Sequence, residues 1–519
     1  MRHLFLTIGL LACCVHCPLN ASDVNVPISH WVYPYLERME SARIISDPEL
    51  RAYPLTRTAV ARSLVIINAN RNKLSAVDQQ RLDQLRLEFD QELVALGEKA
   101  PARYAERHFI RWREDEHYAF FDIDFRQTFE KVTSNRDTLD ERTSRTRLGG
   151  IVRGQLGGKL GFFMHAHNTL LRGTQDYAVQ FDPGIGTPIG MAGDNAYSDD
   201  ATAYITFSNR WMFLEFGRDQ IKWGPGYRGS LMLSRENPQF ELLKIQFSFK
   251  RWNYSAFHGW LHYSGDAKYL AGHRLSWRLL PWLYVSGSET VIYSNRNIEP
   301  LYVNPFMPFH VAEHHLGDKD NNAMSFDLTA FPIVGHKFYL GLFLDDFNSS
   351  KPLLKHYGNK FAFLIGHQWV DPFGLTDSEL RWEYTRVEPY VYTHKDSTLI
   401  YDNYNQSIGH WLGPNADDLF IQFEHSFHKD VSAALFTERI RHGRGDMYHP
   451  HTWADGWYKK FLEGTVETDW KTGFEITDQI MRDTFITLRY NYARISNLDR
   501  QDGVSATNHE AHIRLVLNW

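Results

Sequence analysis

Three residues of the sequence have the spacing of a zinc-dependent hydrolase site. His310, Glu313 and His314 form the pattern H-x-x-E-H, in which two histidines on one helix can hold a metal ion and the glutamate can activate water. Prolines before the motif and Gly317 after it leave room for a helix of only about two turns. We therefore interpret the motif as part of a polar loop, and we predict neither a metal site nor a cofactor.

A second group of residues has the chemistry of a sugar-binding site. Arg218, Asp219, Trp223 and Tyr227 lie close together around Gly224-Pro225-Gly226, a run that cannot continue a β-ladder. Flat rings stack on the apolar faces of pyranoses, and charged groups make strong, oriented hydrogen bonds to hydroxyls. We predict that these four residues bind polysaccharide. The alternative interpretation is structural: Arg218 and Asp219 would form an ion pair in a lumen, and Trp223 would pack the turn.

The composition argues against several other classes of function. The chain has 56 Lys and Arg against 62 Asp and Glu, a net charge of −6, which is unlike a nucleic-acid binder. Its three cysteines, Cys13, Cys14 and Cys17, all lie near the N-terminus, so the rest of the chain has no thiol for catalysis or disulfides. The G-x-S-x-G nucleophile elbow and the phosphate-binding glycine loop are missing from the sequence. We predict that the protein is not an enzyme.

The first residues read as an export signal. Arg2 and His3 precede an apolar run that is too short to span a bilayer as a helix, and small residues follow it. We predict a signal peptide over residues 1–21, with cleavage after Ala21. The alternative is a lipoprotein signal in which Cys13 is acylated.

Residues 22–108 are expected to form a small helical module in the periplasm. Apolar residues recur there at i, i+3, i+4 and i+7 in three short stretches. Thr56 is the expected N-cap of the second helix, and Ser75 with Asp78 has the form of a capping box before the third. A resemblance to one S-layer homology repeat, which we interpret as structural, is carried by His30–Tyr33, Leu36-Glu37 and Pro54–Ala61.

From residue 109 to residue 519 the hydrophobic period changes from 3.6 to 2. Phe121, Ile123 and Phe125 alternate with charged residues, which places rings on one face of a strand and charges on the other. Several such runs reach the length of about nine residues that a tilted strand needs to cross a bilayer. We therefore predict an all-β fold: an antiparallel transmembrane β-barrel of about 18 strands, at roughly 23 residues per strand and connection. Trp519 is expected to end the last strand on its apolar face.

Several passages of the barrel region together resemble the Wzi capsule-assembly family. They are Gly217–Ser234, Leu301–Phe306, Glu313–Asn322, Phe338–Gly341 and Leu344–Phe347. The resemblance implies an outer-membrane β-barrel of a Gram-negative-type bacterium, with a helical module at its periplasmic end. It also implies a lectin-like role in attaching capsular or related exopolysaccharide to the cell surface.

Three functions follow as hypotheses. The first is non-catalytic attachment of surface polysaccharide, with outer-membrane lipid and the barrel-assembly machinery as further partners and no nucleic acid. The second is a porin-like channel for polar solutes, which the charges on one strand face favour. The third, an outer-membrane hydrolase, depends only on scattered Ser, His and Asp. Fold analogy cannot choose among them, because barrels support all three.

Overall fold

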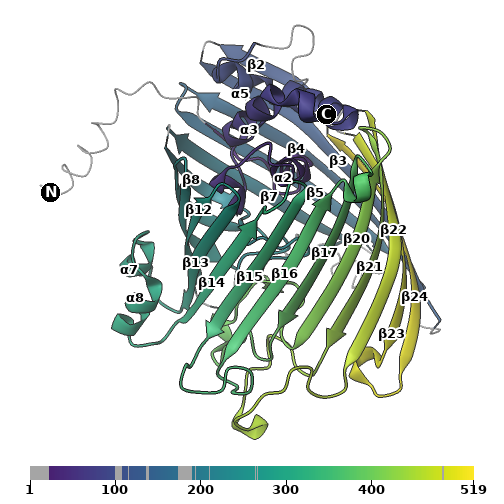
Figure 1. The fold of residues 1–519 in the computed structure, drawn as a ribbon. Coiled ribbons are helices and arrows are strands. Elements are labelled where there is room, and N and C mark those ends of the chain that lie inside the picture. Colours follow the sequence, from purple (N-terminus) through teal and green to yellow (C-terminus); the bar gives the residue numbers. More distant parts are fainter. Residues whose placement is uncertain are drawn as a thin grey trace, which may run out of the picture.

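The structure, a computed structural model, is a closed antiparallel β-barrel with a helical module at one end (Figure 1). It describes residues 23–99, 108–114, 116–135, 140–173, 190–192, 195–209, 211–262, 265, 267–481 and 484–518. Within these ranges, no helix has the length and apolar character needed to cross a membrane. The predicted signal peptide, residues 1–21 with Cys13, and the terminal Trp519 lie outside the described residues.

Eighteen strands of the described chain form the ring, which confirms the predicted antiparallel barrel. Each strand pairs with its neighbours in antiparallel register, and the last strand pairs with the first long one to close the wall. Because the barrel is closed, each of these ring strands has a paired strand on both sides, and none is an edge strand. The ring strands are β3 (His117–Ser134), β4 (Asp140–Leu156), β5 (Leu160–Gly173), β7 (Asn195–Ser208), β8 (Met212–Asp219), β10 (Phe240–Ser248), β11 (Trp252–Leu261), β12 (Lys268–Leu280), β13 (Leu283–Ser294), β14 (Asn321–Ala330), β15 (His336–Asp346), β16 (Lys360–Val370), β17 (Ser378–Val387), β20 (Ala416–Ser426), β21 (Val431–His442), β22 (Glu467–Met481), β23 (Thr484–Ser496) and β24 (Ser505–Asn518).

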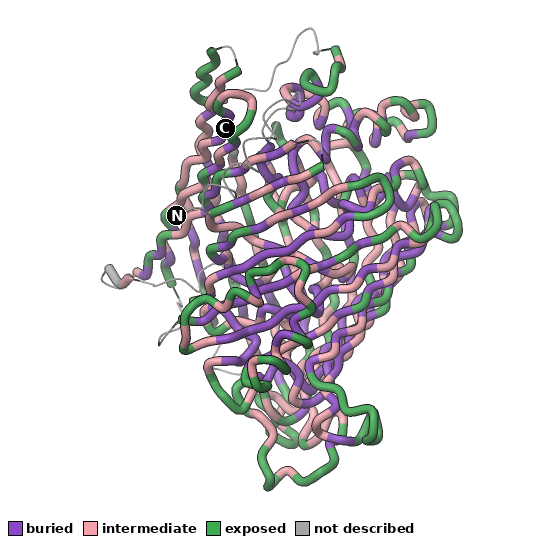
Figure 2. Tube along the Cα trace, turned by 90° about the vertical axis from the view of Figure 1, so that its left-hand side faces the viewer, coloured by how far each residue is buried: buried purple, intermediate pink, exposed green. Residues whose placement is uncertain are grey.

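The alternation of the sequence sets the two faces of the wall. On β3 the side chain of Asp124 is buried in the lumen, where it accepts hydrogen bonds from Arg147 and pairs with His165. On the outer face Phe129 is 53% exposed and Leu148 of β4 is 59% exposed. Figure 2 shows the same mixture of buried and exposed residues along the strands, whereas the loops at the end away from the module are largely exposed.

The connection between β4 and β5 is a tight turn at Gly157-Gly158. Leu156 pairs with Leu160, so Lys159 is one extra residue between the two glycines and the ladder. Both glycines have positive φ, 59° and 62°, as the turn requires. The Lys159 N–H donates to the Leu156 carbonyl over 3.2 Å and closes the turn around the two glycines.

The helical module contains α2 (Val32–Ser41), α3 (Arg57–Ala69), α4 (Ala76–Glu88) and α5 (Asp90–Ala95) around its own apolar core. The two predicted caps are confirmed, since Thr56 accepts from the Ala59 N–H and Ser75 accepts from the Asp78 N–H. The third predicted helix is wrong in one respect: it is divided into α4 and α5, because Phe89 leaves helical geometry with φ −102° and ψ 25°. The last helix ends at Ala95, and the short strand β2 (Ile110–Glu114) pairs beside β3.

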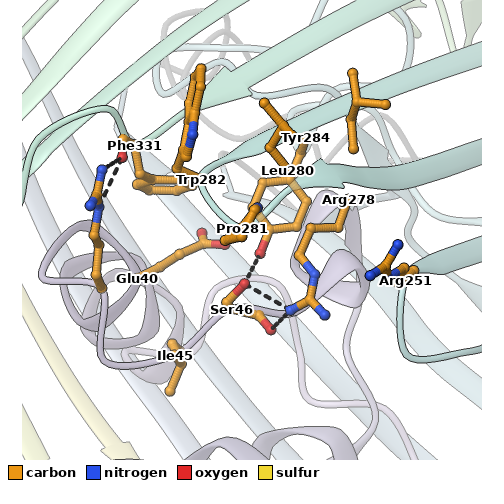
Figure 3. Close-up of a pocket in the computed structure, with 12 residues that line it drawn as sticks. Glu40, Ile45, Ser46, Arg251, Arg278, Leu280, Pro281, Trp282, Tyr284 and Phe331 are labelled. Atoms are coloured by element: carbon orange, nitrogen blue, oxygen red, sulfur yellow. Dashed lines mark hydrogen bonds between the residues drawn. The ribbon is translucent and has the colours of Figure 1, made fainter.

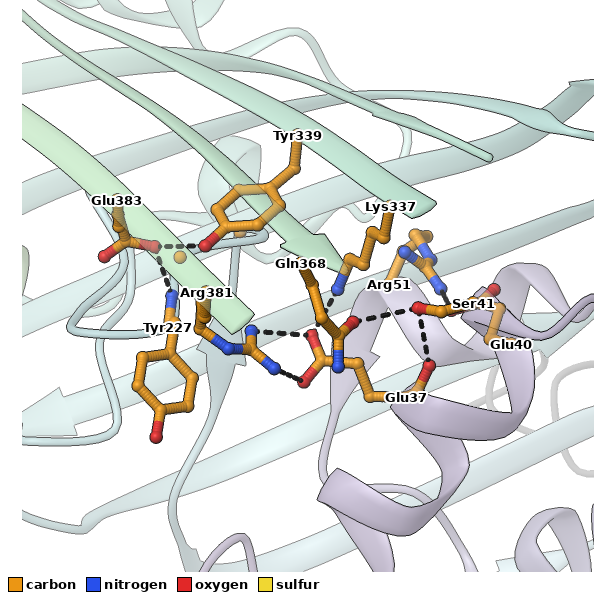
Figure 4. A network of polar contacts seen from close by, with 12 residues as sticks. Glu37, Glu40, Ser41, Arg51, Tyr227, Lys337, Tyr339, Gln368, Arg381 and Glu383 are labelled. Carbon is orange, nitrogen blue, oxygen red and sulfur yellow. Dashed lines mark hydrogen bonds and ion pairs between the residues drawn. The ribbon is translucent and has the colours of Figure 1, made fainter. Parts of the chain in front are cut away.

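Ion pairs dock the module against the inside of the barrel wall (Figure 4). Arg381 of β17 donates to Glu37 of α2 over 2.9 Å and to Glu379 over 2.6 Å, and Lys337 of β15 also pairs with Glu37. Ser41, at the end of α2, donates to Gln368 over 2.8 Å. The contacts between the module and the wall join side chains 300 or more residues apart in sequence, and they fix α2 in the barrel mouth.

We expect docking of the module to weaken in acid. Burial acts to raise the pKa of the Glu37 carboxyl, but the charges of Arg381 and Lys337 outweigh burial and hold that pKa below its ordinary value. A carboxyl with a lowered folded-state pKa contributes full stability above its unfolded pKa and loses it as the pH falls further. Hydrogen exchange of the α2 amides, corrected for intrinsic rates, should therefore stay constant down to about pH 4.3 and accelerate below it. A Glu37→Gln variant should lose this acid-dependent component; an unchanged pH profile in that variant would show that another group is responsible.

Two long connections fill the lumen beside the module. Residues 220–239, after β8, and residues 388–415, after β17, form an apolar cluster with inward side chains of the wall such as Phe343 and Leu364. The Tyr392 hydroxyl donates to the Leu231 carbonyl over 2.6 Å and joins the two connections. The strand alternation predicts a lumen lined by charged side chains. Where the two connections lie, protein occupies most of that lumen.

Candidate functional site

The structure places Trp223 and Tyr227 inside the barrel. Trp223 is 1% exposed, lies on β9 (Lys222–Trp223), and packs against Phe257 at a ring distance of 5.2 Å. β9 pairs with β1 (Ala52–Tyr53) of the helical module. The Tyr227 N–H donates to Glu383 over 2.7 Å, and the Arg381 guanidinium lies 4.1 Å above its ring. These positions match the structural alternative for Trp223, which packs the inward turn.

Arg218 and Asp219 follow one another on β8 but do not pair with each other. Asp219 accepts from the Asn25 side-chain amide over 2.8 Å, which joins the end of β8 to the N-terminal segment. Arg218 donates to Asp200 over 3.2 Å and pairs with Glu241. It lines a cavity of about 670 Å³ whose other polar groups come from β5, β7 and Tyr404.

The connection between β21 and β22 lies at the end of the barrel opposite the module (Figure 1) and carries exposed aromatic residues. Trp453, Trp457 and Tyr458 belong to the connection between β21 and β22 and are 78%, 59% and 68% exposed. The two indole rings meet edge to face at 5.5 Å. Tyr357, from the connection between β15 and β16, stacks on His451 at 3.7 Å. We call these five residues the aromatic surface.

Hydrogen bonds within and between the two connections support the aromatic surface. Thr452 and Asp455 form a capping box around the short helical turn that carries Trp453. The Arg444 guanidinium donates to Asp455 over 2.9 Å. The Lys459 N–H donates to the Lys355 carbonyl over 2.7 Å, which joins the two connections. Rings that are fixed before binding lose little conformational entropy when a ligand stacks on them.

Exposed polar groups belong to the same connection as the rings. Asp446 and His449 pair over 2.7 Å on the exposed side of the same connection. Carboxylates and imidazoles can accept and donate hydrogen bonds to sugar hydroxyls, while indole rings cover apolar pyranose faces. The arrangement can therefore bind a polysaccharide, and its exposure leaves room for a long chain.

The sequence prediction missed the aromatic surface. It gave Trp453, Trp457 and Tyr458 no role. The available signal was the density of rings between residues 448 and 458, in a stretch without strand alternation. Tyr357 could not have been added, because its place beside His451 depends on two connections that are far apart in sequence.

The H-x-x-E-H motif lies on α8 (Phe309–Leu316), a helix of about two turns on the outside of the wall. The N–H groups of Phe309 and His310 donate to Glu289 of β13 over 2.8 and 2.6 Å. Burial, aided by nearby acidic groups, raises the pKa of Glu313 to about 7. Among the described residues, no group of three or more His, Cys, Asp or Glu side chains is arranged to hold a metal ion.

The fold is a closed β-barrel of the type found in outer membranes; its own connections fill the lumen, and the loops at the end opposite the module present aromatic rings. The sequence profile of the capsule assembly protein Wzi matches residues 125–510, and the chain belongs to that family. The resemblance seen in the sequence is thus confirmed, and it includes the Gly217–Ser234 passage.

Solved structures share the fold at low sequence identity. Wzi of Escherichia coli, an outer-membrane protein involved in group 1 capsule assembly and described as a carbohydrate-binding β-barrel, superposes with a TM-score of 0.58 at 15% identity, over 95% of this chain and 99% of its own. OccK3 (OpdO) of Pseudomonas aeruginosa and OccAB1 of Acinetobacter baumannii each give a TM-score of 0.45 at 11% identity, over 77% and 80% of this chain and 95% and 98% of theirs. No curated protein sequence matches the chain.

Proposed function

We propose that this protein attaches capsular or another surface exopolysaccharide to the outside of the cell, as a lectin and without catalysis. The helical module faces the periplasm, so the aromatic surface at the other end faces the medium. The polymer contacts Trp453 and Trp457 through sugar faces and Asp446 through hydroxyls. Arg218, in its polar cavity, remains a further candidate for polysaccharide contact.

The observation that carries the proposal is the exposure of Trp453, Trp457 and Tyr458 on a connection that a capping box supports. Large rings exposed together on a protein surface mark an interaction site. Membership of the capsule-assembly family and the carbohydrate binding stated for the Escherichia coli protein support polysaccharide as the ligand.

The other two hypotheses receive less support from the structure. A channel for polar solutes needs a continuous wet path, but the apolar cluster of residues 220–239 and 388–415 and the docked module occupy the lumen. A hydrolase needs a nucleophile or an activated water beside its binding site. The aromatic surface instead offers rings for stacking, and the exposed pair of Asp446 and His449 for hydrogen bonds to hydroxyls.

Deleting the gene tests the proposal in the cell. We expect the total amount of surface polysaccharide to stay unchanged while most of it moves from the cell pellet to the medium, because synthesis continues without the attachment point. Polymer in both fractions can be measured chemically, and the wild-type gene on a plasmid should restore the cell-bound fraction. An unchanged cell-bound fraction in the deletion strain would rule out an attachment role.

A further inference from the structure

A cavity lies between the helical module and the turns of the wall at the module's end (Figure 3). Its volume is about 470 Å³. One side is formed by Arg43 and Ser46, which follow α2. The other side is formed by Arg251 in the β10–β11 turn and by Arg278 and Trp282 at the β12–β13 turn.

Three guanidinium groups from three separate segments line this cavity. Arg278 donates to the Ser46 hydroxyl over 3.0 Å, and Arg43 donates to the Phe331 carbonyl over 2.9 Å. The Arg251 carbonyl accepts from the Arg278 N–H over 2.7 Å, but the exposed Arg251 guanidinium has no hydrogen-bond or ion-pair partner among the residues that the structure describes. The carboxylate in the lining, Glu40, is already paired with the buried Arg51. The cavity therefore carries an excess of positive charge with no bound counter-charge from the lining.

Exposed rings place the cavity at the level of a membrane interface. The β10–β11 turn reads Phe-Lys-Arg-Trp, and its Phe249 and Trp252 rings stack at 4.1 Å. Trp252 lies opposite Trp277 in the register of β11 and β12, and both rings are exposed on the outer face. Tryptophan rings of membrane barrels concentrate at the interface between hydrocarbon and headgroups. Arginines beside such rings lie where lipid phosphates lie.

We propose that this cavity binds the phosphate group of an anionic phospholipid from the leaflet at the module's end. The phosphate diester would lie between Arg251 and Arg278, because guanidinium groups match the paired oxygens of a phosphate. The acyl chains would run along the outer wall beside Leu279 and Leu280, which are 43% and 42% exposed. Because Arg278 also bonds Ser46, the lipid contacts a residue that joins the module to the wall.

The test is lipid binding to the full-length protein, measured by native mass spectrometry from detergent. Phosphatidylglycerol should bind more tightly than phosphatidylethanolamine, since both have a phosphate diester but only the first has a net charge. Arg251→Gln should weaken phosphatidylglycerol binding about fivefold, the expected effect of one basic residue near an anionic headgroup. Because the Arg251 side chain makes no described polar contact and the replacement keeps its carbonyl bond with the Arg278 N–H, we expect the surrounding structure to be preserved.

A matched control is Arg71→Gln, which removes one charge from the exposed surface of the module, where Arg71 pairs with Asp83. This control should bind phosphatidylglycerol like the wild type. Equal loss in both variants, or no preference for phosphatidylglycerol over phosphatidylethanolamine, would overturn the proposal. Full competition by millimolar inorganic phosphate would assign the site to the free anion, and would overturn the lipid as its ligand.

Discussion

Replacement of Trp453 and Trp457 by alanine is expected to abolish detectable binding of the surface polysaccharide. Both rings are mainly exposed, so the change removes stacking area without opening a hole in the protein. Truncating a tryptophan at the centre of a binding site costs about 2 kcal/mol. Each single variant should therefore bind about thirtyfold more weakly. Isothermal titration with purified polysaccharide measures this directly, and cells carrying the double variant should release polymer into the medium.

The control for this experiment is Trp112→Ala. Trp112 is 46% exposed on β2, beside the helical module. Its replacement therefore also removes an exposed indole, but at the opposite end of the barrel from the aromatic surface. Its affinity for the polysaccharide should equal that of the wild type. Wild-type affinity in the Trp453 and Trp457 double variant would move the binding site away from the aromatic surface. Arg218→Gln would then be the next variant to test, because the Arg218 cavity is lined by polar groups.

Arg381→Ala should destabilise docking of the helical module by about 3–5 kcal/mol, the usual cost of leaving buried charges without a partner. The Arg381 side chain is 2% exposed and pairs with both Glu37 and Glu379. Its removal also takes the guanidinium away from the Tyr227 ring. Native-state hydrogen exchange of α2 in detergent should show faster opening by a factor of hundreds or more.

Arg71→Ala is the matched control for the Arg381 variant. Arg71 pairs with Asp83 at the surface of the module, with side chains 37% and 53% exposed, and such pairs contribute about 0–1 kcal/mol. The amides of α2 should exchange at the wild-type rate in this control. If Arg381→Ala behaved like Arg71→Ala, the apolar contacts of the module, and not the ion pairs, would hold it in the barrel.

Local patterns of the sequence were sufficient for the secondary structure. The alternation of Phe121, Ile123 and Phe125 with charged residues predicted both the strand β3 and its two faces, because side chains of a strand point in opposite directions with a period of 2. The caps at Thr56 and Ser75 were predicted for a similar reason: the donor and acceptor of a cap are three residues apart. The boundary between α4 and α5 was not predicted, since the break at Phe89 has no glycine or proline to mark it.

By itself the sequence determined the barrel, the two faces of its strands, the helical module and the family resemblance. Each of these features depends on spacings of a few residues or on a continuous passage of the sequence. Only the tertiary structure decided where the Trp-Gly-Pro-Gly passage goes. It turns inward, buries Trp223 and pairs with the module through β1 and β9. The aromatic surface also depends on tertiary structure, since Tyr357 and His451 meet only after β16 to β21 have placed their connections side by side. Contacts of that range depend on the register of many strands, which no local pattern contains.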